Sequence, residues 1–349
     1  MATMTAAVLT GHGGPSMLQV RHDVPTPVPD PGQVRVRVTA ASVNNTDLWT
    51  REGAYGTAQD PEAIAGWRGV PLSFPRIQGA DVVGTVDAAG DGVARGMVGT
   101  RVLLDPARMD GDGEEPEFVG LMGSEFDGGF ATHVVVDVEH AHDLSASPLS
   151  DVELACLPIA YGTAMGMLDR AQITAGETLL VTGASGGVGL AVVQLAVARG
   201  VRVVALTSAS GRELVAASGA TAAIDRHSDD VAGEIAQAAE GELDVVADVV
   251  GGWAFGALLD LLGTGGRWVV SGAIAGPVVD LDLRRLYLRR RRLIGSTMHT
   301  PTQFRRLVQV ARAGDVAPHV DDTFPLAQIH AAQEAFAAPG RQGKIVIVP

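Results

Sequence analysis

A glycine-rich turn in the middle of the chain is the residue pattern best suited to chemistry. Residues 179–189 read LLVTGASGGVG, with a strand-like run entering the turn and a helix-like run, VGLAVVQLAVARG, leaving it. In this context glycines let the backbone approach a pyrophosphate, which the free N–H groups of the helix N-terminus bind. The alternative is a tight turn that binds nothing. The predicted cofactor-binding residues here are Gly183, Ala184 (at the first position of G-x-G-x-x-G), Ser185, Gly186, Gly187 and Val188, with Gly189 allowing close helix packing.

The choice of dinucleotide depends on a position 19 residues beyond Gly189, at the end of VVALTSASGRE. An NAD site places Asp or Glu there to bind the ribose diol, whereas this chain has Ser208. Nothing acidic repels a 2′-phosphate, and Ser208, Ser210 and Arg212 can donate hydrogen bonds to one. We therefore predict NADPH as the cofactor, with solvated loop residues and dual cofactor use as the alternative.

The segment TGASGGVG also fits the glycine turn of short-chain dehydrogenases. Those enzymes carry the turn near the N-terminus and use a Tyr-x-x-x-Lys pair. Here the turn lies mid-chain, the single lysine is Lys344, and no tyrosine precedes it at that spacing. That family is therefore rejected.

The elements that must position the turn alternate between strand and helix from about residue 151. Strand-like runs such as TLLVTG, VRVVALT, DVVADVVG and RWVVSG are separated by helical patterns at RELVAASG and FGALLDLL. Such alternation predicts a doubly wound parallel sheet. Further helices are expected near 302–313 and 325–338, followed by a terminal strand, KIVIV.

The first 150 or so residues have a different texture. Short β-branched or alternating runs, among them QVRVRVTAASV and GFATHVVVD, are divided by Gly, Pro and Asp, which suits a small barrel. Residues 54–75 and 105–123 are rich in Gly, Pro and Asp and weakly periodic, so we expect long loops that rim a cleft.

Composition narrows the class of protein. The chain has 349 residues, enough for two domains, and 46% hydrophobic with 19% charged residues is typical of a globular protein. A net charge of −14 disfavours nucleic acid and anionic membrane as partners.

With one cysteine, Cys156, disulfides within the chain and a four-thiolate zinc lobe are impossible, and its apolar setting predicts a packed thiol. No membrane-spanning or signal segment is apparent, so we expect a cytoplasmic protein.

One basic run stands against this acidic background. Arg284, Arg285 and Arg289 to Arg292 lie in LRRLYLRRRRLIG. We interpret them as the solvated face of a short helix leading into a strand, and a phosphate or acyl-carrier contact is the alternative.

Segments spread over nearly the whole chain resemble the medium-chain dehydrogenase/reductase superfamily, in its zinc-independent quinone oxidoreductase and enoyl reductase branch. They are ASVNNTDLWTREGAYG, FPRIQGADVVGTV, GGFATHVVV, LPIAYGTA, VTGASGGVG, DVVADVVGG and GKIVIVP. The resemblance implies an α/β chain with a GroES-like β-barrel catalytic domain and a Rossmann domain. The expected boundaries are 1–150 for the first part of the catalytic domain, 151–298 for the NADP-binding domain and 299–349 for the return.

The positions that hold zinc in metal-dependent relatives differ here. The Cys of their C-x-x-D motif is similar in place to Asn44, the His of G-H-E to Ala80, and the ligand just before the Rossmann domain to Ile159. An amide and two alkyl groups are not a competent zinc triad, so no metal is expected. Asp81 is interpreted as a structural acceptor, and His140 and His142 are expected to face solvent.

Without a metal, the easiest reaction is hydride donation to a conjugated acceptor, such as a quinone or an α,β-unsaturated carbonyl. Tyr55 matches the tyrosine that enoyl reductases of this branch use as proton donor, and Asn44 could hydrogen-bond the substrate oxygen or the nicotinamide ribose; the alternatives are a packed loop aromatic and a structural turn amide. By the same resemblance, the nicotinamide side of the cofactor site would include Thr163, Gly272, Ala273 and Met298.

Three readings of function stay open. The leading hypothesis is reduction of a small-molecule quinone or activated C=C with NADPH; the others are a metal-free carbonyl reductase or alcohol dehydrogenase-type tailoring enzyme, and a non-catalytic NADPH-binding structural or sensor protein. Relatives dimerise by continuing the Rossmann sheet, so a homodimer through the strand near RWVVSG is expected. Trp67, Phe74 and Phe118 could line the acceptor pocket or anchor their loops.

Overall fold

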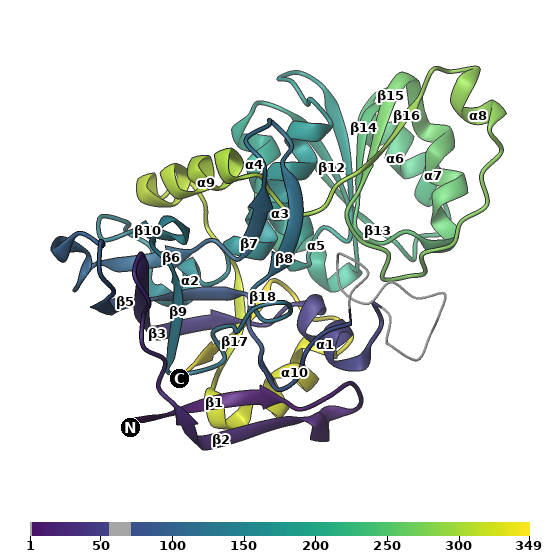
Figure 1. The fold of residues 1–349 in the computed structure, drawn as a ribbon. Coiled ribbons are helices and arrows are strands. Elements are labelled where there is room, and N and C mark those ends of the chain that lie inside the picture. The colour runs from purple at the N-terminus through teal and green to yellow at the C-terminus, as the bar shows by residue number, and fades with distance from the viewer. Residues whose placement is uncertain (1, 56–70) are drawn as a thin grey trace. The chain divides into compact units, whose positions relative to one another are not determined.

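The chain folds into two units (Figure 1). The computed structural model describes residues 2–55 and 71–349. One unit combines Met1–Ile159 with Thr300–Pro349, and the second comprises Ala160–His299. In the described residues no helix is long and apolar enough to cross a membrane.

The first unit is built on largely antiparallel sheets. In the described residues β3 lies centrally, since it pairs with β5, β9 and β18, and a separate three-stranded sheet has the order β2-β1-β4. The strands are β1 (Thr3–Leu9), β2 (Leu18–Pro25), β3 (Gln33–Ser42), β4 (Arg76–Ile77), β5 (Asp81–Ala89), β6 (Arg101–Leu104), β7 (Ala107–Asp110), β8 (Glu117–Leu121), β9 (His133–Asp137), β10 (Ala141–Asp143), β17 (Val320–Pro325) and β18 (Lys344–Val348).

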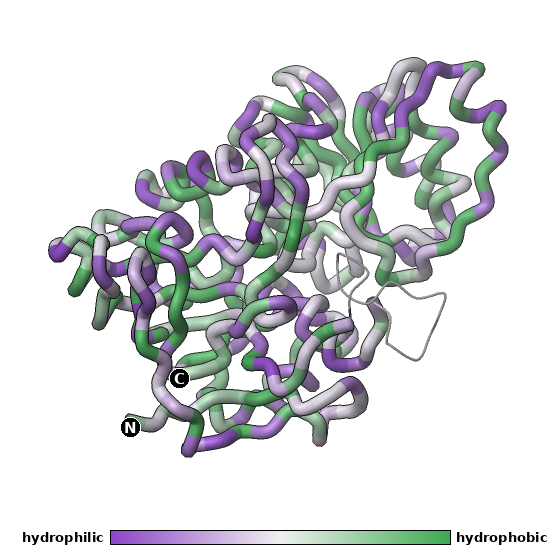
Figure 2. The backbone as a smooth tube through the Cα atoms, in the orientation of Figure 1, coloured by the Kyte–Doolittle hydropathy of each residue, from purple (hydrophilic) through white to green (hydrophobic). Residues whose placement is uncertain are grey.

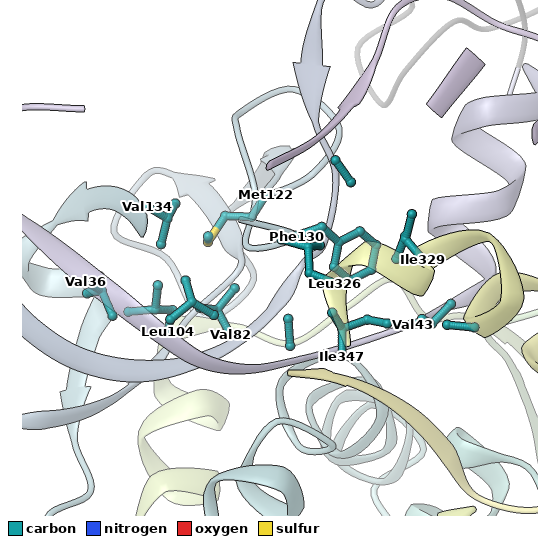
Figure 3. Close-up of a cluster of buried hydrophobic side chains, with 14 of the residues drawn as sticks. Val36, Val43, Val82, Leu104, Met122, Phe130, Val134, Leu326, Ile329 and Ile347 are labelled. Carbon is teal, nitrogen blue, oxygen red and sulfur yellow. The ribbon is translucent and has the colours of Figure 1, made fainter. Parts of the chain in front are cut away.

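Alternation along β3 explains its place in this sheet. Val34, Val36 and Val38 are buried, while the intervening arginines point to the other face, where Arg35 pairs with Asp87. Period-two alternation of this kind gives a strand one apolar face. Figure 3 shows that face joining side chains from β5, β6, β9, β18 and α10 in one core. Two chain segments 300 residues apart therefore share a core, which holds the start of β18 beside the end of β3.

Residues 107–121 form a hairpin rather than the predicted loop. β7 and β8 pair antiparallel, with Ala107 opposite Leu121 and Asp110 opposite Glu117. The expectation for 105–123 was therefore wrong: the Gly-, Asp- and Glu-rich turn between the strands masked two short strand patterns. The other predicted loop, 54–75, lies mostly outside the described residues, as does Trp67.

The helices of this unit begin and end as local sequence dictates. They are α1 (Asn45–Glu52), α2 (Asp151–Leu154), α9 (Pro301–Ala313) and α10 (Ile329–Ala337), and α3 (Pro158–Arg170) starts at the unit's end. In α9, Thr300 caps the N-terminus by accepting the Gln303 N–H, and Gly314 ends the helix at φ 74°. Hydrophilic and hydrophobic residues alternate around α9 (Figure 2), as an amphipathic helix requires.

The second unit is a parallel sheet with helices. Its strand order within the described residues is β13-β12-β11-β14-β15-β16. The strands are β11 (Thr178–Thr182), β12 (Arg202–Thr207), β13 (Ala222–Asp225), β14 (Leu243–Asp248), β15 (Leu262–Val270) and β16 (Arg292–Gly295), and the helices after α3 are α4 (Gly187–Ala198), α5 (Arg212–Ala217), α6 (Val231–Ala239), α7 (Phe255–Leu261) and α8 (Arg284–Tyr287). All five residues of β11 are buried, as in a sheet covered on both faces.

The apolar core of this sheet explains its helices. Side chains of α6 and α7, including Ile235 and Leu259, cluster with Leu180, Val204 and Trp268 from the strands. The order reverses between β11 and β14, and the carboxyl ends of parallel strands flanking such a switch point are where ligands bind.

The strand that the sequence predicted at the dimer edge of the parallel sheet is not an edge strand. The strand near RWVVSG is β15, and it pairs with β14 on one side and β16 on the other. It is therefore interior, and the two edge strands of this sheet among the described residues are β13 and β16. In the basic run, Arg284 pairs with Asp282, Arg285 with Asp260 and Arg289 with Glu242. Arg291 is buried and donates to the Leu262 and Gly263 carbonyls, so the predicted solvated face does not include it.

Candidate functional site

The glycine turn joins β11 to α4 at the carboxyl end of the sheet. Gly183 has φ 60°, and Gly186 precedes the first residue of α4. A Cβ on Gly189 would lie 2.2 Å from the Gly183 carbonyl oxygen, so helix and strand approach as closely as predicted. A Cβ on Gly186 would meet nothing nearer than 3.4 Å. The turn therefore leaves open space beside the first N–H groups of a helix, which is suited to an anion.

The residues of the turn differ in their exposure. Ser185, Gly187 and Val188 are partly exposed, whereas Ala184 is fully buried. The Ala184 N–H donates to the Leu206 carbonyl at 3.1 Å, so it ties the turn to β12 and does not face a ligand. Gly211 packs against Ser185, since a Cβ there would lie 2.7 Å from the Ser185 Cβ. The glycine turn and the end of β12 thus form one surface.

The end of β12 carries the predicted 2′-phosphate residues. The Ser208 and Ser210 hydroxyls lie 3.1 Å apart. Arg212 donates from Nε to the Ala223 carbonyl at 2.9 Å, which turns its guanidinium toward β13.

Sequence reasoning missed Arg226, directly after β13. Its backbone N–H donates to the Thr207 carbonyl at 2.8 Å, so it lies beside Ser208, and its side chain is exposed. Strand pairing, Thr207 opposite Asp225, brings it there, and no local motif marks it.

The predicted nicotinamide-side residues lie on neighbouring segments of the same unit. Gly272 and Ala273 follow β15, and Met298 follows β16 at φ 50°. Thr163 lies on α3, which packs on the Met298 segment: Arg170 Nη1 donates to the Met298 carbonyl at 2.9 Å. Asp248, at the end of β14, accepts from Thr182 Oγ1 at 2.6 Å and from the Val250 N–H at 2.9 Å, and so shapes the turn beside Gly272.

The first unit contains a buried polar cluster centred on Lys344. The Lys344 side chain is 5% exposed, and its ammonium donates to the Val43 carbonyl at 3.1 Å, Asn44 Oδ1 at 2.5 Å and Asp81 Oδ2 at 3.0 Å. Asp81 Oδ2 also accepts from Ser42 Oγ at 2.5 Å and Asn44 Nδ2 at 2.9 Å, while Oδ1 accepts the Ile159 N–H at 2.7 Å. Every proton of the ammonium has an acceptor, which a buried charge requires.

Asp47 lies next to this cluster on α1, and Tyr55 follows α1 in the chain. The Asp47 carboxylate accepts the Asn44 N–H at 2.8 Å, and burial raises the pKa of Asp47 to about 7. Burial likewise raises the pKa of Tyr55 to about 12. Tyr55 therefore keeps its proton at neutral pH, and its ring packs edge-on against Trp49 with centroids 5.8 Å apart.

Three further predictions can be compared with their surroundings. Cys156 is a packed thiol, as expected: it is buried, burial raises its pKa to about 12, and Sγ donates to the Val152 carbonyl at 3.3 Å. Phe74 packs on the barrel core and on the His12 ring. His142 does not face solvent, because its ring packs 5.1 Å from that of Phe304 and burial lowers its pKa.

Two protein families match ranges within this chain. A family described as "Alcohol dehydrogenase GroES-like domain" matches residues 30–146, and one described as "Zinc-binding dehydrogenase" matches residues 187–313. The crystal structure of a putative alcohol dehydrogenase from Sinorhizobium meliloti 1021 is 45% identical, with a TM-score of 0.93 over 99% of this chain and 97% of that one. The chain belongs to the medium-chain dehydrogenase/reductase superfamily.

Within this superfamily the chain falls in the quinone oxidoreductase-like branch, and it is an oxidoreductase of that family. Human quinone oxidoreductase is 26% identical over 99% of this chain and 98% of its own length. The structure of the 2-octenoyl-CoA carboxylase reductase CinF, in complex with NADP and 2-octenoyl-CoA, is 26% identical, with a TM-score of 0.84 over 99% of this chain and 87% of that one. The predicted fold class, a GroES-like domain with a Rossmann-like parallel sheet, is confirmed.

The donors at the superfamily's metal position do not suit zinc in this chain. Asn44 offers an amide whose oxygen already accepts from Lys344 and whose nitrogen donates to Asp81. Ala80 and Ile159 are alkyl, and the Lys344 ammonium lies among these residues. A second cation there would be repelled, and it would find neither thiolate nor imidazole. Asp81 is the structural acceptor that the sequence predicted.

Proposed function

We propose that this protein is an NADPH-dependent, metal-free reductase of quinones or of the activated C=C of α,β-unsaturated carbonyls. The Lys344 cluster carries the proposal, because a fully hydrogen-bonded ammonium stands where a Lewis-acidic metal would otherwise polarise an alcohol. The acceptor must then be electrophilic by conjugation. Human quinone oxidoreductase and the 2-octenoyl-CoA carboxylase reductase CinF bear names that fit such acceptors.

The second unit supplies the residues that would hold NADPH. Gly186 leaves space for the pyrophosphate, and Gly187 and Val188 present N–H groups of the first helical turn. Ser208, Ser210 and Arg226 would receive the 2′-phosphate, with a serine rather than an acidic side chain at position 208. NADPH, when bound, supplies the hydride; Thr163, Gly272, Ala273 and Met298 would orient the nicotinamide.

Tyr55 would serve the acceptor's oxygen. When a hydride adds to the β-carbon of an enone, the C=C electrons shift to the carbonyl, an enolate forms, and the α-carbon then takes a proton. A phenol that keeps its proton at neutral pH can donate a hydrogen bond to that developing oxyanion. Asn44 is a positioning residue in this proposal, because its side chain is engaged by Lys344 and Asp81.

The test is spectrophotometric. NADPH oxidation is measured against NADH over a panel of quinones, enones and aldehydes, with and without a chelator, and products are analysed for C=C or C=O reduction. We expect quinone- or enone-stimulated NADPH oxidation that the chelator leaves unchanged, with kcat lowered in Tyr55→Phe. Chelator-sensitive alcohol oxidation would refute the proposal in favour of a metal-dependent alcohol dehydrogenase, whereas C=O reduction that the chelator leaves unchanged would favour the second candidate, a metal-free carbonyl reductase. NADPH binding without turnover of any acceptor would indicate a sensor or structural protein.

We also propose a homodimer through β16. This edge strand and the preceding α8 segment expose Leu293, Tyr287 and Leu288, the last at 70%. A free strand edge beside apolar side chains is a surface that a second copy can cover. Light scattering that gives a monomer mass at assay concentration would contradict this assignment.

A further inference from the structure

The turn that follows β12 packs directly on the glycine turn through Gly211. Gly211 is buried, and a Cβ added to it would lie 2.7 Å from the Ser185 Cβ and 2.5 Å from Thr207 Oγ1. The Ser185 Cβ is bonded to the backbone, so no side-chain rotation moves it away. A side chain at position 211 would therefore push the two turns apart.

The close approach to Ser185 and Thr207, and not the backbone conformation, calls for glycine at this position. Gly211 has φ −86° and ψ −9°, values that residues with a side chain also adopt. An alanine there would meet the contact described above without adding backbone strain. The effect of such a substitution would thus report on the spacing of the two turns.

Gly211 belongs to the same short turn as the serines proposed for the 2′-phosphate. The 3-10 helix Ala209–Gly211 follows Ser208, and the Gly211 N–H donates to the Ser208 carbonyl at 3.0 Å. Ser208 is half-buried, Ser210 is exposed, and their hydroxyls lie 3.1 Å apart. A displacement of Gly211 would therefore move both serines relative to the glycine turn.

The chemistry of NADPH makes this spacing matter. One ribose carries both the 2′-phosphate and the 5′-pyrophosphate, so a single five-membered ring limits the distance between the two anionic groups. Hydrogen bonds from N–H or O–H donors to oxygen are formed only over a narrow range of lengths, about 2.5–3.2 Å. The donors of the two turns must match the ring together. NADH lacks the 2′-phosphate and makes no such demand.

We infer that Gly211 is a positioning residue that determines cofactor specificity: because it has no side chain, it holds the 2′-phosphate donors at the distance from the glycine turn that NADPH requires. The inference rests on the proposed function. It assigns part of the preference for NADPH over NADH to a residue that has no polar side chain of its own.

The first experiment compares two isomeric probes on the native protein. 2′,5′-ADP carries its phosphates at the positions found in NADPH, whereas 3′,5′-ADP has the same charge with one phosphate moved by one ring carbon. Competition against NADPH fluorescence gives both dissociation constants. We expect 2′,5′-ADP to bind about tenfold more tightly, a difference equivalent to one charge-assisted hydrogen bond. Equal binding would overturn the inference, because the site would then respond to charge and not to spacing.

The second experiment changes the residue itself. In Gly211→Ala we expect the ratio of the NADH to the NADPH dissociation constant to fall about tenfold, with a smaller preference between the two isomers. Adding Ser185→Gly removes the Cβ that the new methyl meets, so the double variant should regain part of the NADPH preference. Gly266→Ala is the matched control, because Gly266 is a buried glycine of β15 whose Cβ would lie 2.6 Å from Leu262 Cδ1. This control should lower stability and leave both ratios unchanged.

The outcomes separate the inference from the proposed function. If Gly211→Ala weakens NADPH and NADH equally, or changes neither, the role of Gly211 is overturned while the proposed function stands. If the native protein binds NADH as tightly as NADPH, or binds neither, the NADPH assignment fails and the inference fails with it. Unfolding curves show whether each variant is folded; should Gly211→Ala not fold, the isomeric probes on the native protein and the double variant decide.

Discussion

The glycine turn of the second unit and the Lys344 cluster of the first unit differ in how their polar groups are satisfied. The turn is made of backbone: its glycines provide close approach, and its polar groups are N–H donors that face outward. The cluster is built around two buried side chains, and the polar atoms of Lys344 and Asp81 are hydrogen-bonded to each other and to neighbouring residues of the protein. A backbone site can be incomplete until a ligand arrives, whereas a buried ion pair must be complete in the protein itself. We propose that the turn binds a ligand and that the cluster positions its own members.

Replacing one residue should therefore lower the stability of the protein most when that residue belongs to the Lys344 cluster. Lys344→Met removes the ammonium and leaves Asp81 as a fully buried carboxylate without a counter-charge. Removing one partner of a buried ion pair lowers the free energy of unfolding by about 3–5 kcal/mol. The urea concentration at the midpoint of unfolding should therefore fall. Adding Asp81→Asn removes the stranded charge, and the double variant should regain part of the loss. A single variant as stable as the native protein would mean that the cluster does not position anything.

Two substitutions in the glycine turn should affect folding stability and NADPH binding separately. Substitutions in the Lys344 cluster cannot make this distinction. Gly189→Ala places a methyl 2.2 Å from the Gly183 carbonyl oxygen, an overpacking that should cost about 1–3 kcal/mol of unfolding free energy. Gly186→Ala meets nothing closer than 3.4 Å, so it should unfold like the native protein but bind NADPH roughly tenfold more weakly, about 1.4 kcal/mol. Thermal unfolding and a fluorescence titration with NADPH measure the two effects. If Gly186→Ala binds NADPH normally, the open face of the turn is not the pyrophosphate site.

The same contrast explains what the sequence could predict. The turn is contiguous in the chain, so Gly183, Gly186 and Gly189 could be assigned by spacing within a strand-turn-helix pattern. Lys344 joins Asp81 only because β18 pairs with β3 across the barrel, and no local pattern encodes that partnership. Arg226 was missed for the same reason, because β13 pairing brings it to Thr207. The hairpin at 107–121 was missed because strands of four and five residues are too short to show periodicity.

A smaller effect on stability is expected from Asp47, at the edge of the Lys344 cluster. The pKa of Asp47 is about 7 in the folded protein against an ordinary value of 3.8. Between about pH 4 and pH 7 the folded chain holds a proton that the unfolded chain has released, so its stability is highest at the acid end. The unfolding free energy should fall with rising pH by up to about 1.4 kcal/mol per unit. Asp47→Asn should flatten this slope in urea titrations from pH 4.5 to 7; an unchanged slope would show that another group titrates.

The smallest change expected concerns the rim of the cofactor site. Arg226 and Arg212 both flank Ser208 in sequence or space and are both exposed, but Arg212 Nε donates to the backbone Ala223 carbonyl, whereas Arg226 Nε donates to the side chain of the neighbouring His227 at 3.1 Å. Exposed charge-assisted hydrogen bonds are worth about 1 kcal/mol, so Arg226→Ala should lower the NADPH-to-NADH ratio of kcat/KM severalfold, and Arg212→Ala should lower it less. Raising the salt concentration should narrow the difference between Arg226→Ala and the native protein, because a solvent-exposed contact to phosphate is screened. The reverse order of the two variants would return the 2′-phosphate to Arg212, the residue that the sequence alone suggested.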